Sequence, residues 1–226
     1  MVDPDSWVRA ESWFNPATFQ LNRPEDAEID RFDNSLYTSL TNNTDDPHGR
    51  IRRLAEEGRD PTAETFEWSD IAVGGEDAAQ VAGFSSPDNL VFDKLGNLWM
   101  VTDISSGSLN EGVYAWHRNN GIFMIRVGGP DAGLALRLGS VPNEAESTGP
   151  IWTPRQDTMF LAIQHPGEET SSAGGVYGDP ERAEAPIPDL VVVPFKGHGF
   201  PRPDFVGDAE LHLRDGMVAK VLFRAP

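Results

Sequence analysis

The sequence contains no cysteine. This absence excludes disulfide bonds, thiolate metal sites and cysteine nucleophiles, and it leaves the cellular compartment open. Lysine is scarce as well, because Lys94, Lys196 and Lys220 are the three lysines among 18 basic residues. The sequence also lacks a Gly-x-Ser-x-Gly elbow, a His-Glu-x-x-His helix, a P-loop and a dinucleotide fingerprint. The enzyme classes that these motifs identify therefore have no support in the sequence.

Long apolar runs are missing too. No stretch approaches ~18 apolar residues, so we expect no membrane-spanning helix. The first 20 residues lack the basic start and the apolar run of a signal peptide. Two explanations stay open: the protein remains inside the cell, or the chain is a mature or truncated piece of a longer one.

Acidic residues, by contrast, are abundant. The chain of 226 residues has 36 acidic residues and a net charge of −18. Nucleic acids and anionic membrane surfaces repel such a polyanion, so we expect neither as a partner. The excess fits a halophilic protein kept soluble in concentrated salt, or a calcium-rich site on an ordinary acidic surface. The acids are spread along the whole chain, which favours the halophilic explanation.

Three segments of the chain look like imperfect copies of one another. Each opens with a carboxylate, runs into a strand, makes a tight turn and enters a second, more apolar strand. The opening carboxylates are Glu25, Asp88 and Glu146, roughly 60 residues apart, a period slightly above that of common propeller repeats. The repeat places one acid at the same end of the first strand in successive blades, as a ring of acids around a central channel requires.

The pattern of short, turn-punctuated runs predicts an all-β fold, a partial β-propeller of about three four-stranded blades. We expect an irregular segment over residues 1–22 and a propeller portion over 23–226, with blades at about 23–80, 81–140 and 141–226. The tryptophans of the strands are expected in the blade cores. The expected strands are 27–30, 35–41, 50–54 and 65–73, then 89–93, 98–103, 112–117 and 122–127, then 148–153, 158–165, 190–195 and 217–223. Asn119-Asn120-Gly121 is expected to form a hairpin turn, and 167–188 a long insertion.

Several of these segments resemble the PhoX-type alkaline phosphatases. The resemblance is collinear over roughly residues 20–205, and it implies a six-bladed propeller that uses calcium and iron to hydrolyse phosphate monoesters. It also implies export to the periplasm or the extracellular space by the twin-arginine route. The segments that carry it are Arg23–Asp26, Gly58–Pro61, Thr65–Trp68, Ser86–Trp99, Glu146–Pro150, Gln164–Glu168 and Pro201–Pro203.

The chain departs from the family pattern in two ways. It matches only the C-terminal half, whereas the N-terminal half supplies iron ligands that include a cysteine. The family also carries a phosphate-gripping arginine just upstream of the Glu146-type residue, where this chain has Asn143 and Glu144. A carboxylate repels phosphate, so the resemblance supports the fold and the metal sites better than phosphatase activity.

The resemblance assigns calcium to Glu25 and Glu146, and Asp88 occupies the same place in the repeat. Calcium takes six to eight hard oxygen ligands, which carboxylates from neighbouring blades can supply. Other roles stay open: Glu25 can pair with Arg23, Glu146 can be a solvated loop acid, and Asp88 can form an Asx turn. Iron is expected only in the complete assembly.

Asp103 and His165 end the second strands of their blades, near the expected mouth of the channel. They are the candidate catalytic or water-ordering groups, although a lone histidine is more often structural. The other histidines, His48, His117, His198 and His212, show no metal spacing and are expected to be structural or solvent-facing.

Two functions therefore stand side by side. The first is a PhoX-like, calcium-dependent phosphoric monoester hydrolase, or the C-terminal half of one, acting on a small phosphate ester. The alternative is a non-catalytic metal-binding scaffold or interaction module. Three blades cannot close a six-bladed ring, so we expect a second chain or the missing N-terminal half as a partner.

Overall fold

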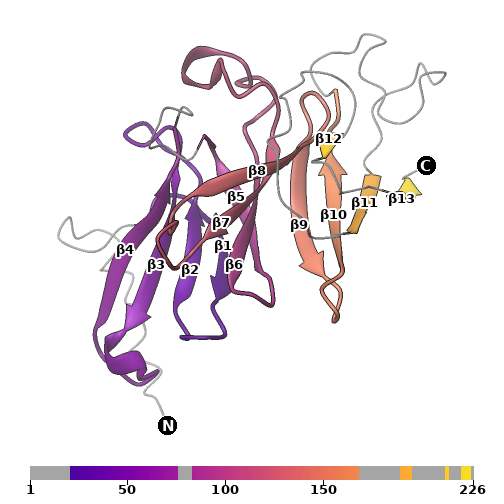
Figure 1. Cartoon of the computed structure of the whole chain (residues 1–226). Coiled ribbons are helices and arrows are strands. Elements are labelled where there is room, and N and C mark those ends of the chain that lie inside the picture. The colour runs from indigo at the N-terminus through magenta and orange to yellow at the C-terminus, as the bar shows by residue number, and fades with distance from the viewer. Residues whose placement is uncertain (1–20, 76–82, 168–188, 195–211, 214–219, 225–226) are drawn as a thin grey trace, which may run out of the picture.

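The computed structural model describes residues 21–75, 83–167, 189–194, 212–213 and 220–224 (Figure 1). The expected irregular segment over 1–22 and the insertion over 167–188 lie almost entirely outside the described residues. Within the described part, no helix is long and apolar enough to cross a membrane.

Three antiparallel sheets stand side by side (Figure 1). The first has the strand order β1-β2-β3-β4, with β1 at Pro24–Ile29, β2 at Leu36–Leu40, β3 at Arg50–Glu56 and β4 at Phe66–Val73. The second has the order β12-β8-β7-β6-β5, with β5 at Pro87–Phe92, β6 at Asn97–Thr102, β7 at Gly121–Arg126, β8 at Ala135–Ser140 and β12 at His212–Leu213. The third has the order β13-β11-β10-β9, with β9 at Glu146–Trp152, β10 at Thr158–Gln164, β11 at Asp189–Pro194 and β13 at Lys220–Arg224.

The first strands of the three sheets lie next to one another. β1 contacts β5, and β5 contacts β9, so these strands form the inner edge of an arc. Two side chains tie the inner strands together: Asp26 accepts a hydrogen bond of 2.7 Å from the N–H of Leu90, and Asn89 accepts one of 2.8 Å from that of Gly149. This is the arrangement of propeller blades around an axis, and the prediction of an all-β partial propeller with three blades is confirmed.

The prediction for the second blade was wrong in one strand. Residues 112–117 do not form a strand; they hold a 3-10 turn, Gly112–Tyr114, and the fourth strand of the blade is β8. Gly112 has a φ of 53°, which breaks the extended backbone that the apolar alternation suggested.

The Asn-Gly pair in this blade does not make the predicted hairpin turn either. Gly121 starts β7, and a Cβ there would meet the Arg137 guanidinium at 2.8 Å. Close packing against Arg137 therefore favours glycine at position 121. The asparagine of the Asn-Gly pair, Asn120, does not form a turn but makes the buried hydrogen bonds described below.

Two apolar cores fill the spaces between blades. One lies between blades 1 and 2 and contains Tyr37, Ile51, Ala72, Phe84, Leu90, Leu98, Met100, Phe123 and Ile125. The other lies between blades 2 and 3 and contains Trp99, Val101, Ile122, Met124, Leu138, Val141, Ala145, Met159, Leu161 and Ile163. Full burial of one such large side chain stabilises a fold by roughly 1.5–3 kcal/mol, so blade-to-blade contact holds the arc together.

The tryptophans follow the prediction only in part. Trp99 is 1% exposed, and Trp152 packs against the same core. Trp68 on β4 is 51% exposed and lies under the Arg52 guanidinium, 4.3 Å from the ring centre. Trp68 therefore lies outside both blade cores, because no blade in the described structure covers that face of the first sheet.

Candidate functional site

The three repeated carboxylates start from the same backbone feature. Arg23, Ser86 and Glu144 have φ values of 45°, 49° and 61°, and each lies two residues before a carboxylate, Glu25, Asp88 or Glu146. Residues other than glycine seldom adopt this left-handed conformation. In the first two blades the carbonyl of the left-handed residue accepts a hydrogen bond from the residue that follows the second strand, Thr41 or Asp103. The repeat seen in the sequence is thus matched in the backbone at the strand ends that carry the acids.

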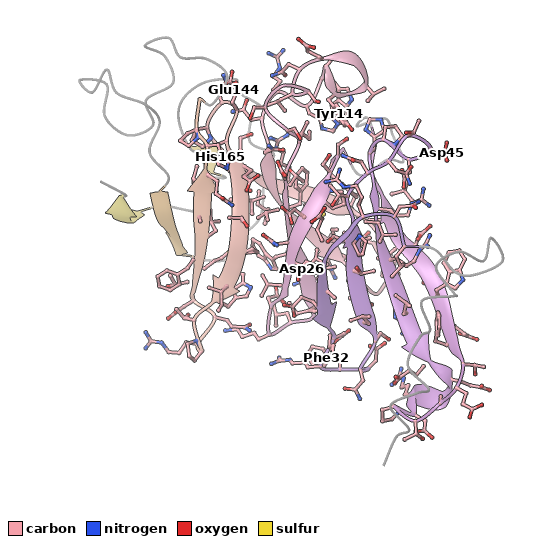
Figure 2. All side chains as sticks on the ribbon, turned by 180° about the vertical axis from the view of Figure 1, so that it is seen from behind. Asp26, Phe32, Asp45, Tyr114, Glu144 and His165 are labelled. Atoms are coloured by element: carbon pink, nitrogen blue, oxygen red, sulfur yellow. The ribbon has the colours of Figure 1, made fainter. Side chains whose placement is uncertain are left out.

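A polar pocket of about 200 Å³ lies between blades 2 and 3 at this end. Its lining combines the end of β6, the start of β9 and the end of β10, and consists of Asp103, Ile104, Ser105, Ser106, Glu144, Glu146 and His165. Figure 2 shows Glu144 and His165 at the same end of the third blade. The tertiary structure therefore brings together three of the five residues that the sequence singled out, Asp103, Glu146 and His165.

Asp88 lies in a field of negative charge. Burial and, after it, the nearby charges of Asp103, Glu25 and Asp26 together raise the pKa of its carboxyl to about 6, whereas Arg23 acts in the opposite direction. Like charges at short range disfavour the ionised form of a carboxyl group, so the acids around Asp88 make its carboxyl hold its proton more tightly. Asp103 thus connects two groups of acids: it lines the pocket with Glu146 and repels the carboxylate of Asp88.

Glu25 lies at the exposed side of this group. Its carboxylate is 3.3 Å from the guanidinium of Arg23, the pairing that the sequence left open as an alternative to a metal role. Arg23 also donates a 2.8 Å hydrogen bond to Asn42, whose amide donates to Ser86 at 2.9 Å. The sequence named Arg23 only as a partner of Glu25, and the structure adds its hydrogen bond to Asn42.

Asn120 positions the wall of the pocket. Its side chain is 1% exposed; the oxygen accepts from the N–H of Ile104 at 2.7 Å, and the amide donates to the carbonyls of Ile104 and Ala145 at 3.0 and 2.9 Å. One buried amide thereby joins the loop after β6 to the segment before β9. These are the two segments that contribute Ser105 and Glu146 to the pocket.

Arg137 holds the other end of the same loop. Its guanidinium is buried and donates to the carbonyls of Asn119 and Asn120 at 2.6 and 3.1 Å and to the hydroxyl of Ser140 at 2.8 Å. Burial lowers the pKa of this guanidinium to about 9. The hydrogen bonds to the backbone carbonyls satisfy the buried guanidinium and fix residues 117–120 at the end of the loop.

Two histidines that the sequence left as structural or solvent-facing, His48 and His117, meet at one serine. The Ser85 hydroxyl lies 2.5 Å from Nδ1 of His48 and 2.6 Å from Nε2 of His117. His117 is 2% exposed, and burial, together with Arg137 and His48, lowers its pKa to about 3. The structural assignment is correct for His117, whose neutral ring links blades 1 and 2; His198 lies outside the described residues.

The donor atoms at this end are carboxylates, hydroxyls and one imidazole. Hard cations such as calcium take oxygen ligands of this kind. Within residues 21–75 and 83–167, however, no three acidic or histidine side chains converge closely enough to hold a metal ion. The described part of the chain therefore supplies several oxygen donors and a negative field at this end.

With this geometry established, comparison with known proteins identifies the family. The family model described as alkaline phosphatase PhoX matches residues 15–167. The chain belongs to the PhoX alkaline phosphatase family. A solved structure, that of Pseudomonas fluorescens PhoX in complex with vanadate, a transition state analogue, is similar with a TM-score of 0.66 and 27% sequence identity. No curated protein matches.

The similarity covers 78% of this chain and 34% of the P. fluorescens PhoX chain. The chain thus spans about a third of that PhoX, and most of the PhoX polypeptide has no counterpart in it. This proportion agrees with the expectation that the chain corresponds to part of a PhoX protein.

Proposed function

We propose that the chain forms part of a calcium-dependent phosphoric monoester hydrolase, with its reaction centre at the pocket between blades 2 and 3. The observation that carries the proposal is the meeting of Asp103, Glu146 and His165 in one polar pocket of a PhoX-family chain. The vanadate complex of P. fluorescens PhoX adds support, since vanadate takes the place of a phosphoryl group in its transition state.

In this proposal the acids hold cations. Glu25, Asp88 and Glu146 are the metal ligands, and Asp103 lies between them as a further oxygen donor. The negative field that raises the pKa of Asp88 is relieved when a divalent cation binds, because the opposite charge favours ionised carboxylates. Bound calcium would neutralise phosphoryl oxygens and orient the attacking group.

The remaining pocket residues have separate tasks. His165 lines the pocket and can transfer a proton to the leaving oxygen as a general acid. The hydroxyls of Ser105 and Ser106 offer hydrogen bonds to a phosphate ester, and Arg23 brings a guanidinium to the same end of the arc. Asn120 and Arg137 act indirectly by fixing the loop that carries the two serines.

The phosphate-gripping arginine expected just before Glu146 is replaced by Glu144, which lines the pocket. For this reason the part of PhoX that the chain does not span must contribute phosphate-binding groups, and iron belongs to that part. A second candidate function, a metal-binding scaffold without catalysis, is favoured by the same carboxylate, because Glu144 would repel a phosphate in this pocket.

Hydrolysis of para-nitrophenyl phosphate tests the proposal. The chain is assayed with calcium and iron, alone and together with the part of P. fluorescens PhoX outside the matched region. We expect activity only in the mixture and a loss of at least tenfold for His165→Ala and Asp103→Asn, because each removes a group that contacts the substrate or its metal. His212→Ala is the control. If mixtures that contain His165→Ala or Asp103→Asn were as active as the mixture with the wild-type chain, the chain would be a scaffold and not part of the reaction centre.

A further inference from the structure

Each blade interface uses the same aromatic contact. The rings of Tyr37 in blade 1 and Phe92 in blade 2 meet edge to face, with 5.2 Å between their centres. The rings of Trp99 in blade 2 and Trp152 in blade 3 do the same at 5.0 Å. In both cases the second strand of one blade sends an aromatic ring onto the inner strand of the next.

The hairpin hydrogen bonds show that these positions are equivalent. The N–H of Asp30, Asp93 and Thr153 donates to the carbonyl of Ser35, Asn97 and Thr158, respectively, in the three blades. Tyr37 and Trp99, the rings that insert into the next blade, each lie two positions after the acceptor residue of this bond. Phe160 occupies the same position in blade 3. The receiving residues directly precede the donor, and Ile29 holds that place in blade 1.

The receiving face continues across each sheet. In blade 2, Phe92 pairs with Leu98, and Leu98 pairs with Ile125; Leu98 and Ile125 are fully buried against blade 1. In blade 1, Ile29 pairs with Leu36, and Leu36 pairs with Leu54, in the same register. Ile29, however, is 61% exposed.

The face of blade 1 is also hollow. An apolar groove of about 610 Å³ crosses the sheet and is lined by Ile29, Asn34, Leu36, Leu54, Glu56, Pro61 and Phe66. An aromatic side chain is the kind of group that fills the corresponding space at both interfaces inside the chain. The groove thus lies where a preceding blade would pack, and its apolar side chains are those that the equivalent positions of blade 2 bury.

We propose that this groove, on Ile29, Leu36 and Leu54, receives an aromatic side chain from the second strand of a preceding β-blade. The proposal rests on the proposed function only for the identity of the partner: the blade belongs to the part of the PhoX polypeptide that the chain does not span. That part is most of the PhoX chain, since the similarity covers 34% of it. The two interfaces inside the chain define the geometry of the contact.

The test is co-purification of the full chain with a tagged polypeptide that comprises P. fluorescens PhoX outside the matched region. Ile29→Glu places a charge in the groove, and Phe32→Glu is the control, because Phe32 is 60% exposed at the β1–β2 turn (Figure 2). We expect the wild type and Phe32→Glu to bind equally and Ile29→Glu to bind at least tenfold more weakly. Melting curves of the isolated variants must coincide, so that loss of binding reports the surface.

If Ile29→Glu and Phe32→Glu bind the tagged polypeptide equally well, the groove is not the binding surface. If the wild-type chain does not bind it, the PhoX part is not the partner. Light scattering on the isolated chain examines a second copy as the occupant. A dimer that both Ile29→Glu and Phe160→Ala dissociate would show that Phe160 of another copy fills the groove, and the PhoX partner would be wrong. Since the readout is binding, a phosphatase assay that fails leaves this result unaffected.

Discussion

The blade interfaces and the acidic end of the arc have opposite designs. The interfaces are apolar, with fully buried side chains such as Leu98 and Leu161 and paired aromatic rings. The acidic end gathers carboxylates that repel one another, and Arg23, Ser86, Glu144 and His165 there have left-handed backbone conformations. Stability is thus concentrated between the blades, whereas the acids at their ends oppose folding until a cation or a partner compensates them.

The sharpest way to test this contrast is to remove a ring from an interface. Trp99→Ala leaves a cavity between blades 2 and 3 and is expected to lower the free energy of unfolding by about 3–5 kcal/mol. Trp68→Ala is the matched control, since Trp68 is 51% exposed. Thermal melts measure both variants. Similar losses for the two would mean that the interface is not the main source of stability.

Asn120 joins the two regions, and its removal is expected to have the next largest effect. Asn120→Ala leaves the N–H of Ile104 and the carbonyl of Ala145 without their partner, which costs roughly 3 kcal/mol and lowers the melting temperature by ~6–12 °C. Asn110→Ala, which removes an exposed hydrogen bond to the carbonyl of Arg118, serves as control. An unchanged melt for Asn120→Ala would refute its role in holding the pocket loop.

At the acidic end, metal affinity is the quantity that responds. Glu146→Gln removes the charge of a proposed ligand, and calorimetric titration is expected to show calcium binding weakened by more than about tenfold. The exposed Glu64 provides a control of equal charge change, Glu64→Gln. If calcium binds both variants and the wild type alike, Glu146 is not a ligand.

Asp88 gives the acidic end a distinct pH dependence. Its pKa is raised to about 6 in the folded chain, so the folded state binds the proton more tightly than the unfolded state, and this contribution to stability is lost as the pH rises through about 6. Asp88→Asn should therefore raise the melting temperature by ~2–4 °C at pH 8, or about 1 kcal/mol, and leave it unchanged near pH 4. Melts must be run without calcium. A variant that is less stable at pH 8 would contradict the repulsion described here.

The smallest expected effect comes from salt. A net charge of −18 repels itself, and screening in molar potassium chloride shortens that repulsion to ~3 Å. The melting temperature should rise by a few degrees between low and molar salt, with calcium held constant. A flat or falling curve would contradict the halophilic interpretation.

The sequence by itself determined the all-β class, three blades and the phase of the repeat. Short apolar runs bounded by turns report local geometry, and Glu25, Asp88 and Glu146 each lie two positions after a residue with a left-handed backbone. The prediction of a strand over 112–117 was wrong because an alternating pattern does not reveal that Gly112 has a positive φ. Once 112–117 was counted as the third strand, β8 was not needed to complete a four-stranded blade and was missed.

Only the tertiary structure decided what lies together. Asp103, Glu146 and His165 are distant in sequence, and they share a pocket because β6, β9 and β10 end at the same side of two packed blades. The hydrogen bonds of Asn120, the burial of Arg137 and the open groove of blade 1 likewise depend on contacts between segments that no local pattern encodes. Side-chain burial and the repulsion between like charges depend on how the chain packs. The sequence could therefore identify the acidic residues but not the repulsion between them that raises the pKa of Asp88.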